Sequence, residues 1–316
     1  MLDYAENDAQ GNGRRRPMRI MLLGADGLLG TAVQETAATH PHVQQLTALG
    51  HSDLDITRPE QVNAAIEKAR PDAVINTAAL MPADRCDEVP AEAYAVNALG
   101  PRYISRACAS VGATPVFVTT DFIYDGTATV PYQPGTLPRP LLTYGITKLA
   151  GEHETRLGSD RHLVVRTSCL FGPRPRSPRA RDSFVDRALD RATAGGDLTV
   201  VDNVITTPTY TMDLAAMVLE LLVSGAESGT YQAVNQGIGS WFDLCLAALT
   251  EEGLGARVSP TQEQSFTAAA RPLYTPLVCT LPEPALAYSR PWRAALAEYL
   301  KVRRGAASLG LESRPS

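Results

Sequence analysis

The sequence predicts an α/β fold: a doubly wound parallel sheet with a smaller C-terminal domain. Three observations predict it. Short apolar runs alternate with amphipathic helical stretches through the first half, a glycine-rich turn follows the first run, and the alternation stops after Gly172. Continuous apolar strands separated by helices are typical of βαβ units around a buried parallel sheet.

The elements follow in order along the chain. We expect strands over residues 19–24, 43–49, 72–79, 114–120 and 162–167, and helices over 28–39, 59–68, 91–111 and 142–157. Thr57 is placed to cap the second helix. A basic, proline-rich loop over 173–181 then breaks the rhythm, and strand, helix and strand patterns return at 196–203, 213–223 and 229–235. From Trp241 onward the chain is helix-rich, with prolines between 271 and 291.

Charge and composition exclude several protein classes. The formal net charge of −5 over 316 residues argues against a nucleic-acid binder. No apolar run approaches the roughly 20 residues that cross a bilayer. Residues 1–17 are polar, and the short apolar run after Arg14–Arg16 does not suit a twin-arginine signal, so we expect a disordered tail.

The cysteines and histidines point away from disulfides and metals. Five cysteines lie far apart without a CxxC spacing, and the five histidines form no HExxH pattern. Scattered thiols in odd number are typical of a reducing cytosol. We therefore expect a cytoplasmic protein with no metal site, no membrane segment and no nucleic-acid partner.

The glycine turn "GADGLLG" predicts a dinucleotide site. It places Gly24, Gly27 and Gly30 between the first strand and the first helix, together with Asp26 and the residues Leu28 and Leu29. Glycines let backbone N–H groups approach a pyrophosphate, and the helix N-terminus adds partial positive charge. The spacing differs from GxGxxG, and a purely structural turn is the alternative. We interpret residues 18–172 as an NAD(P)-binding Rossmann domain with return segments within 198–236, and residues 173–316 as mostly a substrate-binding domain.

The second strand bears on the choice of dinucleotide. It ends "ALGHS", without the acid that holds the ribose 2′-hydroxyl of NAD and without an arginine for a 2′-phosphate. Asp55, followed by Ile56, is placed to reach an adenine, although a turn or N-cap aspartate fits as well. This pattern favours NADPH and leaves NADH open.

Thr120, Tyr144 and Lys148 form the candidate catalytic group. Tyr144 and Lys148 are i and i+4 on a predicted helix and share one face. A nearby ammonium lowers the pKa of a phenol from its ordinary value of about 10, so the pair could protonate an alkoxide formed from a carbonyl. Thr120 ends the fourth strand, where an open α/β sheet binds its ligand. Each residue alone also fits an ordinary surface or strand-end position.

At these residues the chain resembles the extended short-chain dehydrogenase/reductases, and within them the dTDP-4-dehydrorhamnose reductase family of nucleotide-sugar 4-ketoreductases. The resemblance covers about residues 18–300. The stretches that carry it are "INTAALMPADRCDEVPAEAYAVNALG", "TTDFIYDG", "YGITKLAGE", "RTSCLFG", "VVDNVITTPTYTMDLA", "AARP" and "PWRAALAEYL".

The resemblance implies a role for each matching residue. The three glycines would hold the pyrophosphate, Asn76, Ala78 and Ala79 would line the cofactor cleft, and Asn97 would support a proton relay or simply bond a neighbouring carbonyl. Tyr144 would be the general acid, Lys148 its partner and ribose ligand, and Thr120 the hydroxyl that polarises the carbonyl. Residues expected on the substrate side are Asp121, Thr167, Ser168, Asn203 and Arg271; a surface arginine is the alternative for the last.

Departures from the family pattern concern the sugar half. Cys169 stands where the family commonly has Trp, and "RPLYTPL" replaces R-P-x-N-S, which leaves room for a different 4-keto-6-deoxy sugar. The arginines of the 173–181 loop could clamp a diphosphate or belong to a solvated loop. An epimerase or dehydratase stays open, although Phe122 replaces the glutamate of the dehydratase T-D-E motif. A non-catalytic regulatory subunit like that of methionine adenosyltransferase also stays open as an alternative function. The resemblance further implies a possible homodimer.

Overall fold

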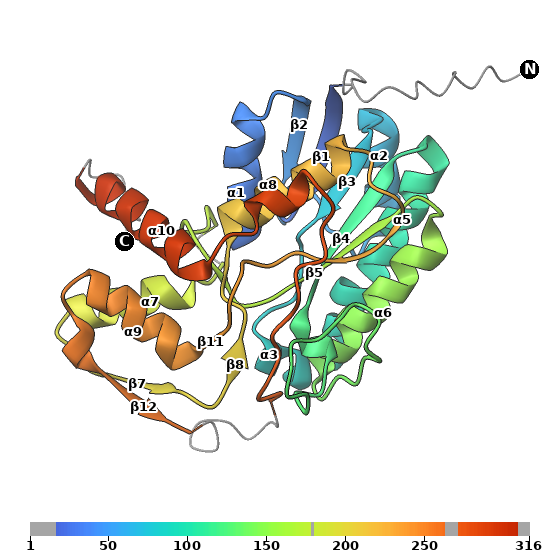
Figure 1. Ribbon diagram of the computed structural model, residues 1–316. Helices are drawn as coiled ribbons and strands as arrows, with labels where there is room; N and C mark the ends of the chain where they lie inside the picture. The colour runs from blue at the N-terminus through green and yellow to red at the C-terminus, as the bar shows by residue number, and fades with distance from the viewer. Residues whose placement is uncertain (1–16, 178–179, 263–270, 309–316) are drawn as a thin grey trace, which may run out of the picture.

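The computed structural model describes residues 17–177, 180–262 and 271–308. Nearly all of the expected N-terminal tail and Arg179 lie outside this part. The centre of the fold is a six-stranded parallel sheet in the order β10-β5-β4-β3-β1-β2 (Figure 1). Its strands are β1 Met18–Leu23, β2 Val43–Leu49, β3 Ala73–Asn76, β4 Thr114–Thr120, β5 Leu163–Thr167 and β10 Gly229–Gln232. This confirms the predicted α/β class.

Helices cover both faces of the sheet, and the central strands β3, β4 and β5 are buried on both sides almost throughout. Ile20 and Leu22 face the helices α1 Leu28–Thr39 and α8 Thr211–Val223, whereas Met21 and Leu23 face α2 Pro59–Ala69 and α5 Gly100–Val111. Helix α6, Thr143–Gly158, packs beside α5 and over β4. Strand order reverses between β1 and β3, which is where doubly wound sheets bind ligands at the carboxyl ends of their strands.

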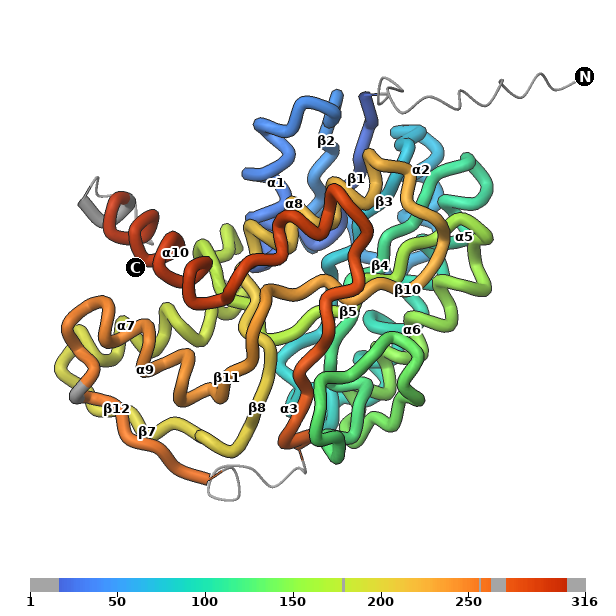
Figure 2. Tube along the Cα trace, viewed as in Figure 1, coloured from blue at the N-terminus to red at the C-terminus, as the bar shows by residue number. Residues whose placement is uncertain are grey.

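A second hydrophobic core lies beside the sheet. It is built from α7 Phe184–Thr193, α9 Trp241–Glu251 and α10 Trp292–Ser308 over the parallel pair β7 Leu198–Val201 and β12 Val258–Thr261. Figure 2 shows the chain leaving the sheet after β5 and returning through α8 and β10 before it leaves again. β7 therefore pairs with β12 outside the main sheet, whereas β10 is a strand of that sheet and α8 packs against it. The boundaries of the two domains stay a prediction.

Short elements complete the fold. They are α3 Ala83–Glu88, α4 Pro90–Tyr94, the π-helical turn η1 Ala95–Leu99, the 3-10 turns η2 Asp121–Ile123, η3 Gly255–Arg257 and η5 Ala285–Tyr288, and the strand pairs β6 Leu170–Phe171 with β9 Thr209–Tyr210 and β8 Ile205–Thr206 with β11 Gly239–Ser240. The single helix expected over 91–111 is thus interrupted by a π turn. Such turns often mark functional sites.

One local prediction was wrong. Helix α2 is capped by Arg58 with Pro59 in its first turn, not by Thr57. The Thr57 hydroxyl instead donates to Asp55 Oδ1 at 2.7 Å, in a turn that ends before the helix begins. Proline at the first helical position fixes the helix start one residue later than the threonine suggests.

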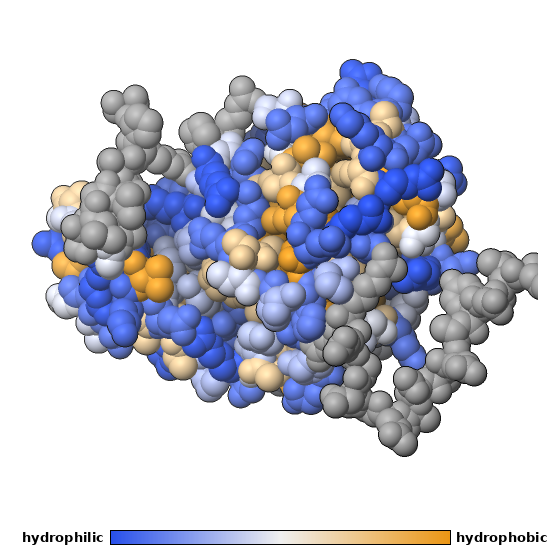
Figure 3. Space-filling model, turned by 90° about the horizontal axis from the view of Figure 1, so that it is seen from above, coloured by the Kyte–Doolittle hydropathy of each residue, from blue (hydrophilic) through white to orange (hydrophobic). Residues whose placement is uncertain are grey.

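The surface seen from above in Figure 3 is mostly hydrophilic, with apolar residues gathered near its middle. Within the described residues, no helix combines the length and the apolar character that a bilayer crossing requires.

Candidate active site

The glycine turn is packed too closely to hold side chains. Gly24 has a φ of +79°, and a Cβ there would lie 2.6 Å from the backbone nitrogen of Ala78. A Cβ on Gly30 would lie 2.2 Å from the carbonyl oxygen of Gly24. The turn therefore lies directly against the end of β3, and α1 lies directly against the turn. Both contacts depend on glycine.

The N-terminus of α1 suits an anion. Its N-cap is Gly27, no side chain caps it, and its first turn, which begins Leu28-Leu29, contains no acidic residue. Leu29 is buried in the core and Leu28 is half-buried. The first N–H groups of a helix have no intrahelical acceptor, so they and the helix dipole attract a phosphate. These features fit the pyrophosphate of a dinucleotide.

The end of β3 provides a second polar feature. Asn76 is 2% exposed, and its Oδ1 accepts from the backbone nitrogen of Ala78 at 3.1 Å. Its Nδ2 is buried and donates to no described residue. An orphaned buried donor calls for an acceptor that the protein does not supply. Ala78 and Ala79, which follow, are half-buried. The arrangement fits the cofactor role expected of these three residues.

The residues after β2 have structural contacts of their own, and Asp55 has the turn contacts that the sequence left open as one alternative. Asp55 accepts from the backbone nitrogen and hydroxyl of Thr57, and these hydrogen bonds lower its pKa. Ile56 is 6% exposed and belongs to the core beneath α2 and α5. Asp55 thus forms a local turn and Ile56 packs in the core.

An acid does stand at the end of β2, and it comes from the glycine turn. A Cβ built on Gly50 would lie 1.9 Å from Oδ2 of Asp26, so this carboxylate touches the α-carbon of Gly50. Gly50 directly follows β2. The sequence motif gave no signal for this contact because the two residues are 24 positions apart.

The three candidate catalytic side chains meet at the carboxyl end of β4. Thr120, Tyr144 and Lys148 are 7%, 9% and 3% exposed. Thr120 lies near enough to Tyr144 to influence the pKa of its phenol. Lys148 Nζ donates to the carbonyl oxygen of Val118 at 2.7 Å and lies 4.2 Å from the centre of the Phe117 ring. Strand β4 and helix α6 thus bring a hydroxyl, a phenol and an amine into one buried group.

The electrostatics of this group differ from the sequence-based expectation. Burial raises the pKa of Tyr144 above its ordinary value, and the neighbouring Thr120 hydroxyl opposes the rise. Burial lowers the pKa of Lys148 to about 7, although the negative charges of Glu152 and of an ionised Cys86 would each raise it. We expected Lys148 to lower the pKa of Tyr144. In the structure the Lys148 amine donates to the carbonyl oxygen of Val118 in β4, and burial keeps the pKa of the phenol above its ordinary value.

Asp121, Ser168 and Thr206 extend the group toward the second core. Ser168 Oγ donates to Asp121 Oδ2 at 2.7 Å and lies 2.6 Å from Thr206 Oγ1, and Thr120 Oγ1 donates to Asp121 Oδ1 at 3.0 Å. Burial raises the pKa of Asp121, and hydrogen bonds from Thr275, Ser168 and Thr120 oppose the rise. Thr167 is buried, and its hydroxyl has no partner among the described residues. Thr206 and Thr275 were not predicted.

Asn97 lies at the centre of the π turn η1 and is fully buried. Its Oδ1 accepts from the backbone nitrogen of Leu80 at 2.9 Å, and its Nδ2 donates to Thr147 Oγ1 at 3.2 Å. Asn97 therefore connects the segment after β3 to the helix that carries Tyr144.

A buried ion pair holds the second half of α6. Arg166 on β5 donates to both oxygens of Glu152, at 3.0 and 2.8 Å, and also to the hydroxyl of Tyr124 at 2.9 Å. Sequence reasoning quoted the stretch that contains Glu152 but assigned this residue no role. A buried arginine in a strand and a glutamate in the neighbouring helix are the signal that could have found the pair.

Two further residues expected on the substrate side are Asn203 and Arg271. Asn203 is half-buried between β7 and β8. Arg271 Nη2 donates to both oxygens of Asp84 in α3, at 2.7 and 2.6 Å.

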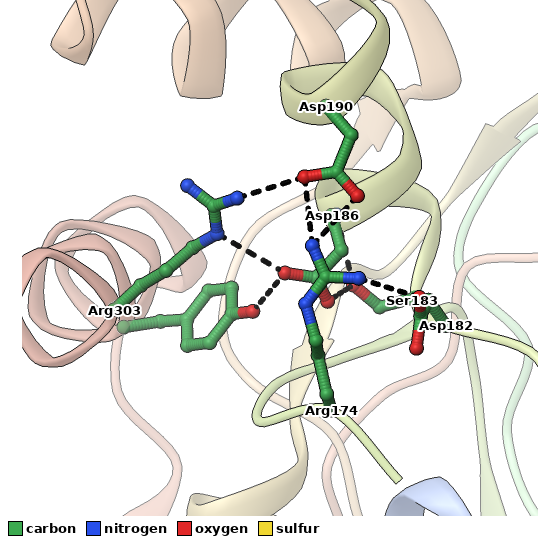
Figure 4. A network of polar contacts seen from close by, with 7 residues as sticks. Arg174, Asp182, Ser183, Asp186, Asp190 and Arg303 are labelled. Carbon is green, nitrogen blue, oxygen red and sulfur yellow. Dashed lines mark hydrogen bonds and ion pairs between the residues drawn. The ribbon is translucent and has the colours of Figure 1, made fainter. Parts of the chain in front are cut away.

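The described arginines of the 173–181 loop are not free clamps. Arg174 donates to Asp182 and Asp190, and Arg303 from α10 also contacts Asp190, in the network of Figure 4. Arg176 donates to Gln34 of α1 at 2.7 Å. Arg174 is therefore already paired with carboxylates and does not fit the role of a diphosphate clamp. Arg181 is exposed, as in a solvated loop.

Comparison with known proteins gives consistent matches along the chain. A family model described as "RmlD substrate binding domain" matches residues 18–304. The dTDP-4-dehydrorhamnose reductase of Mycolicibacterium smegmatis is 34% identical over 320 aligned positions, covering 96% of this chain and 94% of the relative. A crystal structure of a dTDP-4-dehydrorhamnose reductase from Clostridium acetobutylicum is 31% identical, with a TM-score of 0.82, covering 91% of this chain and all of the other. The dTDP-4-dehydrorhamnose reductase of Bacillus anthracis, solved with NADP, is 28% identical, with a TM-score of 0.82, covering 90% of this chain and 99% of the other.

Proposed function

This chain belongs to the RmlD substrate binding domain family, and we propose that it reduces the C4 ketone of a nucleotide-diphosphate 4-keto-6-deoxy sugar with NADPH or NADH. The observation that carries the proposal is the meeting of Thr120, Tyr144 and Lys148 at the carboxyl end of β4. That end lies beside the strand-order reversal where doubly wound sheets bind dinucleotides.

The cofactor would be held by groups already described. The α1 N-terminus at Gly27 would bind the pyrophosphate, and Asn76 with Ala78 and Ala79 would line its path along β3. When bound, the reduced nicotinamide supplies a hydride to a carbonyl carbon. The protein's own task is then to orient the ketone and to supply a proton to its oxygen.

Tyr144 is the proposed proton donor. A raised pKa keeps the phenol protonated near neutral pH, so the hydroxyl can give its proton to the C4 oxygen as negative charge develops there. Thr120 would donate a hydrogen bond to the same oxygen. Lys148, when charged, would stabilise the phenolate that Tyr144 becomes.

Substrate contacts are proposed at the side of the catalytic group that faces the second core. Asp121, Ser168 and Thr167 end β4 and β5 there, and the unpaired Thr167 hydroxyl could bond a sugar hydroxyl. Asn203 and Arg271 are proposed to bind further along the nucleotide sugar. In this arrangement the sheet domain binds the cofactor and the second core binds the substrate.

The test is a reduction assay with a panel of nucleotide 4-keto-6-deoxy sugars, following loss of absorbance of the reduced cofactor. We expect turnover in the wild type and a loss of about 10²–10⁴-fold in Tyr144→Phe, which should still bind cofactor. Tyr288→Phe, at an exposed position, is the matched control and should retain full activity. Undiminished turnover in Tyr144→Phe would contradict the mechanism, and conversion of the sugar without net cofactor loss would indicate an epimerase.

We further propose that the protein acts in the cytoplasm and pairs as a homodimer. The free state of all five cysteines supports the first proposal. Exposed apolar side chains in the helical layer beside the sheet, Tyr94, Leu99, Ile146 and Leu157, support the second. Light scattering on the purified protein measures the mass, and a monomer at micromolar concentration would contradict pairing.

A further inference from the structure

The carboxylate of Asp26 lies at the carboxyl end of β2. Asp26 belongs to the glycine turn, yet its Oδ2 would lie 1.9 Å from a Cβ built on Gly50, the residue that follows β2. The side chain is partly exposed, and none of the described residues donates a hydrogen bond to its oxygens. The carboxylate therefore reaches across the top of two neighbouring strands with its acceptor capacity unused.

This position has a defined meaning in a doubly wound dinucleotide site. The residue at the end of the second strand contacts the adenosine ribose, where an acid accepts from the 2′-hydroxyl of NAD and a cation accommodates the 2′-phosphate of NADP. In this chain the strand itself ends in Gly50, which has no side chain, and Asp26 occupies the space that a longer side chain would fill.

The backbone of Asp26 is held in place from the other side. Its carbonyl oxygen accepts from the backbone nitrogen of Ser177 at 3.0 Å, and the preceding nitrogen of Arg176 donates to Thr31 Oγ1 at 3.2 Å. Arg174, two residues earlier, is fixed by Asp182 and by Asp190 (Figure 4). The segment 174–177 thus lies against the glycine turn and restrains the direction of the Asp26 side chain.

Two further carboxylates lie near the end of β2. Asp53 Oδ2 accepts from the backbone nitrogen of Gly50 at 2.8 Å, and Asp55 follows two residues later. Arg58 is exposed, and its Nε lies 3.9 Å from Asp55 Oδ2. Arg176 donates to the neutral amide of Gln34 on α1 and keeps its charge. Three carboxylates, Asp26, Asp53 and Asp55, thus stand against two arginines around the end of β2.

We propose that Asp26 makes this enzyme select NADH over NADPH, by accepting from the ribose 2′-hydroxyl and repelling the 2′-phosphate. The inference rests on the proposed function, since it assumes that the glycine turn binds a dinucleotide. A carboxylate and a phosphate a few ångströms apart at the surface repel by about 1.4 kcal/mol or more, which corresponds to about tenfold in affinity.

The experiment measures the dissociation constants of NADH and NADPH by fluorescence titration of the full chain. We expect the wild type to bind NADH about tenfold more tightly than NADPH, and Asp26→Asn to remove most of that ratio, chiefly by tightening NADPH. Raising sodium chloride from about 0.05 M to 0.5 M should narrow the wild-type ratio, because salt screens exposed charges. Glu60→Gln, an exposed acid in the first turn of α2, is the control and should leave the ratio unchanged.

The outcomes separate this inference from the proposed function. Equal or tighter NADPH binding by the wild type, or a ratio that Asp26→Asn leaves unchanged, overturns the role of Asp26 while dinucleotide binding stands. Failure of the wild type to bind either nucleotide overturns both. Because asparagine has the shape of aspartate at this partly exposed site, NADH binding by the variant also reports that it is folded.

Discussion

Replacing Glu152 by glutamine should destabilise the protein strongly. The Glu152 side chain is fully buried and the Arg166 side chain is 4% exposed, and the two are joined by two hydrogen bonds of 3.0 and 2.8 Å. Arg156, one turn further along α6, donates to the same carboxylate at 2.9 Å. Glutamine keeps the shape of the side chain but leaves two neighbouring guanidinium groups without a counter-charge.

The expected magnitude follows from burial. Removing one partner of a buried ion pair costs about 3–5 kcal/mol, because the remaining charge stays desolvated and unpaired. Arg166 would keep only neutral acceptors, the hydroxyl of Tyr124 and the carbonyl oxygen of Pro134. Arg156→Gln is the matched control. Since the Arg156 side chain is 29% exposed, losing its pairing should cost about 1 kcal/mol or less.

The assay is urea unfolding followed by circular dichroism, at pH 7.5 and low salt, for the wild type and both variants. A loss below about 1 kcal/mol in Glu152→Gln, or a loss equal to that of Arg156→Gln, would refute the reasoning. Turnover of Glu152→Gln should fall as well, because the same pair holds the helix that carries Tyr144 and Lys148.

Three further predictions follow from single contacts. Burial lowers the pKa of Lys148 in the folded protein to about 7, whereas in the unfolded chain this lysine stays protonated up to its ordinary pKa. The free energy of unfolding of the ligand-free wild type should therefore rise between pH 7 and 10, and urea titrations of Lys148→Met should lack this rise. The same pH dependence of the unfolding free energy in both proteins would contradict the burial argument. Gly24→Ala should weaken cofactor binding by tenfold or more in fluorescence titration, because its Cβ would lie 2.6 Å from the backbone nitrogen of Ala78 at a φ of +79°. Gly112→Ala is the control: it has a similar φ of +76° but open space around the added Cβ, so it shows the effect of backbone strain without the close contact. Asp84→Asn should change folding stability by about 1 kcal/mol or less, because its pairing with Arg271 is half-exposed; a loss of several kcal/mol would show that the pair is more deeply shielded.

The sequence was sufficient for features that are local or periodic. The five strands of the first half and the Thr120, Tyr144 and Lys148 group could be predicted, because apolar runs mark buried strands and helical spacing places i and i+4 on one face. Sequence also indicated that α8 and β10 return after a break, although it could not show that β7 pairs with β12 instead.

The rest depended on contacts between distant segments. The position of Asp26 beside Gly50 depends on how a turn and a neighbouring strand pack together, and no sequence pattern at either residue predicts it. The hydrogen bond from the Lys148 amine to the carbonyl oxygen of Val118 joins α6 to β4, and helical spacing alone does not predict it. Thr57 was misassigned because Pro59 fixes the start of α2. Side-chain direction in the tertiary fold decides each of these cases.

The most direct measurement of the central claim is isotope transfer. The protein would be incubated with a nucleotide 4-keto-6-deoxy sugar and reduced cofactor deuterated at nicotinamide C4, and the product examined by NMR and mass spectrometry. The account predicts one deuterium at C4 of the sugar with the wild type, and none with Tyr144→Phe under conditions where that variant still binds cofactor. A product without deuterium at C4, or labelled product from Tyr144→Phe at the wild-type rate, would contradict it.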